Sequence, residues 1–271
     1  MDLLERRSRK PHAELTIVVL RWRSLSNFSD LDPLEAEPSV RLLWKRPGDP
    51  LGHPDAVILP GSKQTLADLA SVECSGTAEE LKCYAAGGGQ IFGICGGLQM
   101  LGRRLEDPAG LEGPNSAPGI GGSGPVITGL DLLPIHTVFT AGKALRQRLS
   151  QALWPRGGGQ ALELEGFELH HGRSAVIEEE GVGGPAPLAT DPHLGWWQSS
   201  GDRGGVVAGT YLHGVFDNGP WRRRWLNQLR VRRSLPPLSE NQPHQRRHRE
   251  ALLDQLADSF ETHINLAPLL R

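Results

Sequence analysis

One stretch, residues 90 to 102, restricts the possible folds of this chain more than any other. It reads QIFGICGGLQMLG, in which a short apolar run leads to a single cysteine, Cys95, with glycines on both sides and a helix-compatible run behind it. Small neighbours tolerate the strained backbone of a sharp strand-to-helix turn and leave the side chain at its tip clear. The first amides of the helix would face the sulfur, where they favour a thiolate and offer hydrogen bonds to an oxyanion. We therefore predict that Cys95 is a catalytic nucleophile.

Apolar, β-branched runs of strand length alternate with helix-compatible segments elsewhere in the chain. Strands are predicted at 15–20, 56–59 and 206–211, in addition to the one before Cys95. Helices are predicted from Thr65, from Thr77, where Thr77-Ala78-Glu79-Glu80 resembles a capping box, and from Pro220. This alternation predicts an α/β fold, with an open, mainly parallel sheet flanked by helices.

Segments rich in Gly, Pro and Ser indicate loops and suggest the domain limits. A surface loop is predicted at 108–125 and a second at 178–187, with regular structure resuming at 126–133. A linker is predicted at 233–243 and a last helix at 247–263, whose inward face would carry Leu252, Leu253, Leu256 and Phe260. We assign residues 1–12 to a linker remnant, 13–235 to one α/β domain, and 236–271 to a C-terminal linker and helix.

Charge and cysteine content limit the classes of function. The 271 residues carry a formal net charge of −2, which argues against a general role on nucleic acid or at a membrane surface. The last fifth is locally basic, at 222–224, 230–233 and 246–249; we expect these arginines on solvated helix faces, with a docking surface for an acidic ligand as the alternative. No apolar run approaches membrane-spanning length.

The three cysteines, Cys74, Cys83 and Cys95, show no paired metal-ligand spacing, so no metal site is expected. Their odd number, without a secretory segment, favours a reducing cytoplasm.

Two further loops follow predicted strands and would lie near Cys95. Gly61 follows the strand at 56–59, and His213 follows the strand at 206–211. The carboxyl ends of strands in an open parallel sheet share one edge, where sites are built, so these residues should converge there. A histidine facing the cysteine could take the thiol proton and later return it to a leaving amine.

Five motifs in order then carry a family resemblance. The segment at 93–99 resembles the nucleophile elbow of class I, triad-type glutamine amidotransferases, whose fold is flavodoxin-like. The segments at 55–63 and 209–216 narrow the resemblance to the cobyric acid synthase and cobyrinate diamide synthase branch. SNFSDLDPL at 26–34 and EGFELHHGR at 165–173 favour the cobyric acid synthase family.

This resemblance implies a glutaminase that releases ammonia for amidation of corrin side-chain carboxylates in cobalamin synthesis. Cys95 would attack the glutamine amide, and His213 would act as base and acid. The amides of Gly61 and Gly96 would hold the oxyanion. Gln99, one helical turn beyond Cys95, would help to orient the thioester or the bound glutamine.

The chain departs from the common pattern at two points. Triad enzymes place a glutamate two residues after the histidine, where this chain has Val215, as expected of the cobyric branch. That difference implies a Cys–His dyad oriented by another group, for which Asp217, Glu168 and His170 are candidates.

The second departure concerns length. The resemblance implies an N-terminal ATP-binding domain, but this chain begins close to the amidotransferase domain and contains no phosphate-binding motif, so we expect either a separate ATP-binding chain or that this sequence is a fragment or a split gene product. The chain should therefore hold no cofactor, and ATP and magnesium are expected in a synthetase half outside it. Glutamine is the expected substrate, and the corrin acceptor would be reached through that half; no nucleic-acid or membrane partner is expected.

Other functions share parts of this pattern. A cysteine hydrolase of the same fold, such as a peptidase or γ-glutamyl hydrolase, would not deamidate free glutamine. A glutaminase subunit of a lipid II amidating pair would also work beside an ATP-using partner. A subunit that only positions a synthetase would not need an intact Cys95 and His213, and both are present.

Overall fold

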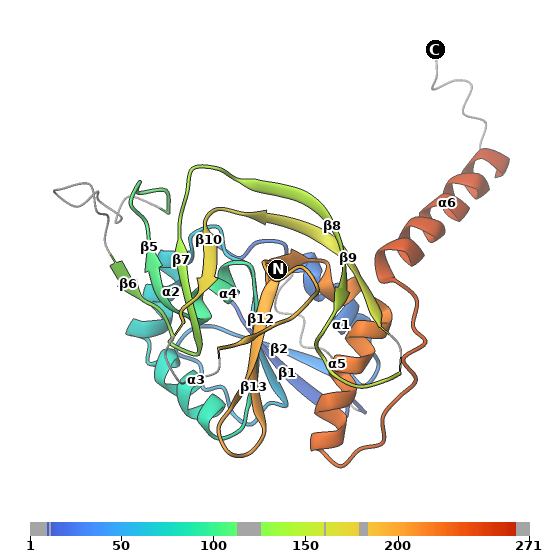
Figure 1. The fold of residues 1–271 in the computed structure, drawn as a ribbon. Helices are drawn as coiled ribbons and strands as arrows, with labels where there is room; N and C mark the ends of the chain where they lie inside the picture. Colours follow the sequence, from blue (N-terminus) through green and yellow to red (C-terminus); the bar gives the residue numbers. More distant parts are fainter. Residues whose placement is uncertain (1–9, 11, 113–125, 160, 179–183, 264–271) are drawn as a thin grey trace.

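A computed structural model describes residues 10, 12–112, 126–159, 161–178 and 184–263 (Figure 1). Its main sheet has seven strands, and the α/β fold with a mainly parallel sheet is confirmed. The strands, in spatial order, are β11 (Ala186–Pro187), β12 (Gly195–Ser200), β13 (Gly205–Thr210), β4 (Gln90–Ile94), β3 (Ala56–Leu59), β1 (Leu15–Leu20) and β2 (Val40–Lys45). The five from β13 to β2 run parallel, whereas β12 and β11 run antiparallel to their neighbours.

Helices cover both faces of this sheet because alternate strand residues are apolar on both sides. In β1, Ile17 and Val19 belong to one core cluster, and Val18 and Leu20 belong to the other. The first cluster packs against α1 (Asp32–Ala36) and α5 (Gly219–Arg232). The second packs against α2 (Thr65–Cys74), α3 (Thr77–Ala86) and α4 (Gly96–Leu101). The strands leading to the predicted site are therefore buried on both faces.

Two smaller sheets, which were not predicted, lie beside the main one. One contains β10 (Arg173–Val176), β7 (Leu133–Val138), β5 (Gly102–Glu106) and β6 (Val126–Thr128). The other contains β14 (Leu212–His213), β9 (Leu162–His170) and β8 (Ala144–Ala152), and Figure 1 shows β8 and β9 as a long, curved pair. The β8–β9 pair was missed because Leu145 and Leu149 of β8 are 71% and 68% exposed and give no buried strand pattern.

The local predictions hold for the strands and helices but not for every detail. The predicted capping box is wrong: Gly76 occupies the N-cap of α3 in a left-handed conformation, and no side chain caps the helix. The hydroxyl of Thr77 instead accepts a hydrogen bond from the amide of Gly48, at 2.8 Å. Regular structure resumes at β6, but residues 129–132 connect it irregularly to β7. Most of the predicted loop at 108–125 and residues 179–183 of the second loop lie outside the described residues.

The arginines of α5 correct the expectation of a solvated basic face. Arg222, Arg223 and Arg230 are 3%, 6% and 2% exposed. Arg222 donates to Glu37 at 2.9 Å, and Arg223 donates to the other oxygen of the same buried carboxylate at 2.5 Å. Arg230 pairs with Glu14. Because long-range carboxylates neutralise these charges, a local charge pattern could not reveal their burial.

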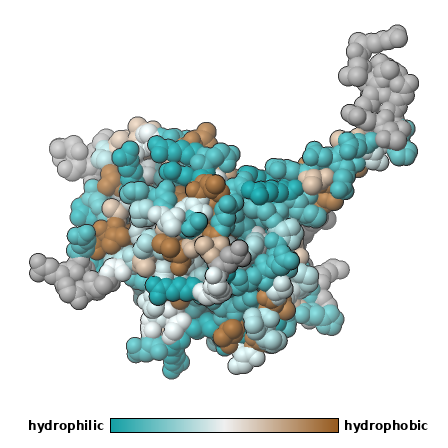
Figure 2. Space-filling model, turned by 45° about the vertical axis from the view of Figure 1, so that its right-hand side comes forward, coloured by the Kyte–Doolittle hydropathy of each residue, from teal (hydrophilic) through white to brown (hydrophobic). Residues whose placement is uncertain are grey.

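The last helix is present, but its predicted packing is wrong. It forms α6 (Gln245–His263), and Figure 2 shows it standing out from the body of the molecule. Leu252, Leu253, Leu256 and Phe260 are between 49% and 59% exposed, so their shared face is not inward. Helical spacing predicts which residues share a face, and it does not show what covers that face. Within the described ranges, none of the helices is both long enough and apolar enough to cross a bilayer.

The proposed domain limits stay predictions. Of the predicted linker remnant, residues 1–9 and 11 lie outside the described residues.

Candidate active site

Cys95 lies at the turn between β4 and α4, as predicted. Its backbone has φ 53° and ψ −108°, which is an unfavourable conformation for a residue with a side chain. The turn is held from both sides, because the Cys95 amide donates to the carbonyl of Thr210 at 2.8 Å and its carbonyl accepts from the amide of Gln99 at 3.1 Å. A Cβ at Gly97 would overlap the Leu59 carbonyl, so only glycine lets α4 approach the sheet this closely.

His213 faces this turn from β14, the short strand after β13. Its side chain is fully buried, and Nδ1 lies 2.7 Å from Oδ2 of Asp30. The other oxygen of Asp30 accepts a hydrogen bond from the amide of Gly214 at 2.9 Å, which fixes the carboxylate. Burial alone would lower the pKa of His213, but hydrogen bonds and charge interactions with Asp30 and Cys95 outweigh it and raise the pKa to about 10. The arrangement therefore favours the protonated form of His213.

Two more side chains hold the imidazole ring. The amide nitrogen of Asn27 lies 3.1 Å from Nε2 and 3.3 Å from Nδ1 of His213. Phe167 of β9 stacks on the ring with a centroid separation of 5.1 Å. Asn27 itself has a left-handed backbone, with φ 49°, at the start of a short 3-10 helix that carries Asp30.

Asp30 was missed by the sequence analysis, and the three candidates for orienting His213 were wrong. Glu168 pairs with Arg148 and with His170 instead, and His170 stacks on Tyr211. The one signal was the segment at 26–34, which supported the family resemblance but suggested no contact with His213. Nothing local shows that residues 183 positions apart meet.

The two predicted oxyanion glycines come together beside this pair. A Cβ at Gly61 would lie 3.4 Å from Cε1 of His213, and one at Gly96 would lie 2.9 Å from the amide nitrogen of Ser62. The carbonyl of Gly61 accepts hydrogen bonds from the amide of Ser26, at 3.0 Å, and from the indole of Trp22, at 3.2 Å. The peptide plane after Gly61 is therefore fixed from outside the site.

Gln99 is buried on α4 and is only 2% exposed. Its amide nitrogen donates to the carbonyl of His171 at 2.9 Å and to the hydroxyl of Tyr211 at 3.3 Å. Its oxygen accepts from the hydroxyl of Thr65 at 3.3 Å. Gln99 thus joins α2, α4 and the β9–β10 turn around Cys95.

Glu112 is a second residue that the sequence analysis did not identify. Its carboxylate accepts a hydrogen bond from the backbone amide of Thr65 at 2.5 Å. The hydroxyl of the same Thr65 donates to Gln99. Burial raises the pKa of Glu112, against hydrogen bonds from Thr65 that lower it. Glu112 thus provides an acceptor for the first backbone amide of α2, which has no partner within the helix.

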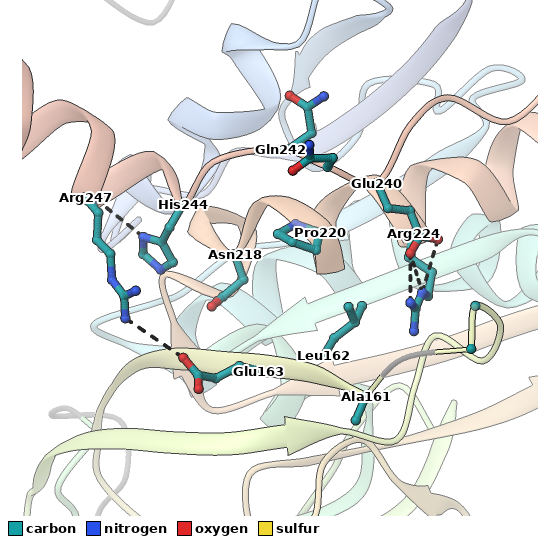
Figure 3. Close-up of a pocket in the computed structure, with 13 residues that line it drawn as sticks. Ala161, Leu162, Glu163, Asn218, Pro220, Arg224, Glu240, Gln242, His244 and Arg247 are labelled. Carbon is teal, nitrogen blue, oxygen red and sulfur yellow. Dashed lines mark hydrogen bonds and ion pairs between the residues drawn. The ribbon is translucent and has the colours of Figure 1, made fainter.

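Strand β9 covers the sulfur of Cys95. Sγ lies 3.5 Å from the carbonyl oxygen of Leu169, and Cys95 is 5% exposed. A cavity of about 690 Å³ lies elsewhere, between the start of β9, the start of α5 and residues 240–247 (Figure 3). None of the predicted site residues lines it, and its charged groups largely pair with one another, as Arg224 does with Glu240.

Comparison with known proteins identifies the family of this domain. The profile of the CobB/CobQ-like glutamine amidotransferase domain matches residues 16–221. The chain belongs to this family. Among relatives of the matched domain, a cobyric acid synthase of Synechococcus sp. strain CC9311 is 62% identical over 270 residues, which are 100% of this chain and 52% of that protein. A cobyric acid synthase of Acaryochloris marina is 46% identical over 274 residues, with the same coverage.

The chain thus spans about half the length of the curated cobyric acid synthases it matches. Solved structures share the amidotransferase fold at low identity. A glutamine amidotransferase covers 79% of this chain and 97% of its own, with a TM-score of 0.53 and 16% identity. PurLQS from Thermotoga maritima covers 74% and 88%, with a TM-score of 0.50 and 14% identity.

Proposed function

We propose that this chain is the glutaminase part of a cobyric acid synthase. It would supply ammonia from glutamine for the ATP-dependent amidation of corrin side-chain carboxylates, from adenosylcobyrinate a,c-diamide to cobyrate, in cobalamin biosynthesis. The observation that carries the proposal is the buried row of Asp30, His213 and Cys95 within a domain of this family. The assignment of a corrin acceptor is supported by the cobyric acid synthases that match the whole chain.

The geometry suits amide hydrolysis through a thioester. The Cys95 thiolate attacks the side-chain carbonyl carbon of glutamine, and the carbon–oxygen π electrons move to the oxygen. His213 donates a proton to the amide nitrogen, the carbon–nitrogen bond breaks, and ammonia leaves. Neutral His213 then takes a proton from water as the water attacks the thioester, and glutamate is released with a regenerated thiolate.

The neighbouring groups have supporting roles in the same proposal. The amides of Gly61 and Gly96 stabilise the oxyanion, and Gln99 orients the thioester or the bound glutamine. Asp30 is a positioning residue, since it contacts His213 and not the reacting atoms. Its hydrogen bond occupies Nδ1, so Nε2, which Asn27 also approaches at 3.1 Å, is the nitrogen that exchanges a proton with sulfur.

The synthetase half would complete the reaction. ATP and magnesium would bind there and activate the acceptor carboxylate, and this chain would need no cofactor of its own. A reducing cytoplasm suits a protein whose three cysteines, Cys74, Cys83 and Cys95, are all free thiols.

Replacement of the nucleophile tests the proposal. The purified chain, with a cobyric acid synthase ATP-binding half, should release glutamate and ammonia from glutamine, and Cys95→Ser should abolish this release. Cys83→Ser removes an exposed thiol and is the matched control, which should keep full activity. Retention of most glutaminase activity in Cys95→Ser would refute the assignment. Hydrolysis of γ-glutamyl peptides without deamidation of glutamine would instead indicate a cysteine hydrolase.

A further inference from the structure

A second cavity, of about 530 Å³, is lined in part by the end of β9 and the start of β10. Its walls come from the loop before β8, from one face of β8 and from β10, and Tyr211 also contributes to it. This volume lies in the range of small-molecule sites.

The lining of this cavity is strongly basic. Lys143, Arg146, Arg148 and Arg173 face a single lining carboxylate, Glu168. Arg148 is neutralised, because it pairs with Glu168 and lies 3.6 Å from Asp191. The other three cations are exposed, and among the residues that the structure describes none of them has an ion-pair partner. The chain as a whole is slightly acidic, so this concentration of positive charge is local.

Two of the residues that line this cavity connect it to the candidate active site. Tyr211 lines it and also accepts the hydrogen bond from Gln99 at 3.3 Å. His170 lines it and stacks on Tyr211, with ring centroids 3.8 Å apart. The residue before His170 is Leu169, whose carbonyl covers the sulfur of Cys95. An anion in the cavity would therefore contact residues that are linked to the surroundings of Cys95 through Gln99 and Leu169.

We propose that this cavity binds a carboxylate group of a small polycarboxylate, namely the acceptor whose carboxylates are amidated. Guanidinium groups recognise carboxylates through paired N–H donors, and Arg146 and Arg173 present two of them from separate strands. Lys143 adds a point charge at the rim. A nucleic acid fits less well, because its affinity depends on many phosphate contacts along a surface and not on three cations around a cavity. The acceptor's identity rests on the proposed function, whereas the existence of the site does not.

Direct binding tests the site without requiring catalysis. The probe is tricarballylate, an aliphatic tricarboxylate, titrated calorimetrically into the full chain at low salt, with its neutral trimethyl ester as the control ligand. The acid should bind and the ester should not. The double variant Arg146→Gln with Arg173→Gln should weaken binding at least tenfold. The double variant Arg146→Lys with Arg173→Lys, which keeps both charges, should lose less affinity.

A matched control separates local recognition from net charge. Arg46→Gln with Lys82→Gln removes the same charge from positions outside the cavity and should leave tricarballylate affinity within about twofold. Equal weakening by both double variants, or no binding by the parent chain, would overturn the proposal.

The α-carboxylate of glutamine is the other source of the same chemistry. Glutamine is therefore titrated into Cys95→Ser with and without the Arg146 and Arg173 changes, which requires no turnover. Its affinity should not change. A parallel loss of glutamine and tricarballylate affinity would assign these arginines to glutamine and refute the acceptor site. Tricarballylate binding by a chain without glutaminase activity would refute only the proposed function.

Discussion

The two sides of the candidate active site are specified by the sequence in different ways. Cys95 and its turn come from one continuous stretch in which Gly93, Gly96 and Gly97 have defined steric roles. The side that holds His213 combines β14 with Asn27 and Asp30, which come from the beginning of the chain. A strained turn can be encoded by its own residues, whereas the orientation of a base depends on long-range packing. The nucleophile is therefore easier to recognise in a sequence than the group that supports its base.

Among substitutions on the two sides of the site, His213→Ala is expected to reduce glutaminase activity most. Without the imidazole, neither formation of the thiolate nor protonation of the leaving ammonia is assisted, so glutaminase kcat should fall by at least about 10⁴-fold. Steady-state ammonia release measures this effect, with circular dichroism to verify the fold. An active His213→Ala enzyme would mean that another group is the base.

Asp30→Asn should have the next largest effect, a loss of roughly 10²–10⁴-fold in kcat with little change in KM. The amide keeps the shape of the side chain but removes the charge that supports protonated His213. Asp217→Asn is the matched control, because Asp217 is close in sequence to His213 and was a candidate for the same role. The opposite ranking of the two variants would show that the contact between Asp30 and His213 does not orient the base.

The same variant predicts a change in the pH dependence of stability. The pKa of His213 is raised from 6.5 to about 10 in the folded chain, so its stabilising effect is complete below pH 6.5 and is lost as the pH rises through about 10. The difference in unfolding free energy between the parent chain and Asp30→Asn should therefore be largest near pH 6 and should shrink toward pH 10. Urea unfolding at several pH values measures it; a difference that grows with pH would contradict the assignment.

The smallest effect is expected from Val215→Ala, at the position where triad enzymes carry a glutamate. Val215 is fully buried among apolar residues, so truncation should cost roughly 0.5–1.5 kcal/mol of unfolding free energy. Its kcat should stay within about twofold of the parent value. A selective loss of activity with unchanged stability would show that this position still takes part in catalysis.

The sequence predicted the features that depend on short-range pattern. The parallel strands, the turn at Cys95 and the helices from Thr65 and Pro220 all follow from periodicity and from glycine or proline positions. The convergence of Gly61 and His213 on Cys95 followed from the rule that parallel strands end at one edge.

The features that were missed depend on contacts between distant segments. The β8–β9 pair exposes its leucines, and Asp30 meets His213 across 183 positions. Burial predicted from residue type was wrong in both directions, since α5 buries arginines and α6 exposes leucines. In each case the burial of a side chain depended on whether another element packs against it, and sequence periodicity does not show this.

The shared carboxylate of Glu37 has a consequence for how this domain can evolve. It neutralises Arg222 and Arg223 at once and joins the end of α1, just beyond the Asp30 segment, to α5. Loss of Glu37 alone would leave two guanidinium charges in the interior, at a cost of about 3–5 kcal/mol. Exchange of all three residues for apolar ones of similar volume could be neutral. These positions should therefore change together or not at all among lineages. The segment that carries Asp30 would then be inherited together with two arginines of α5.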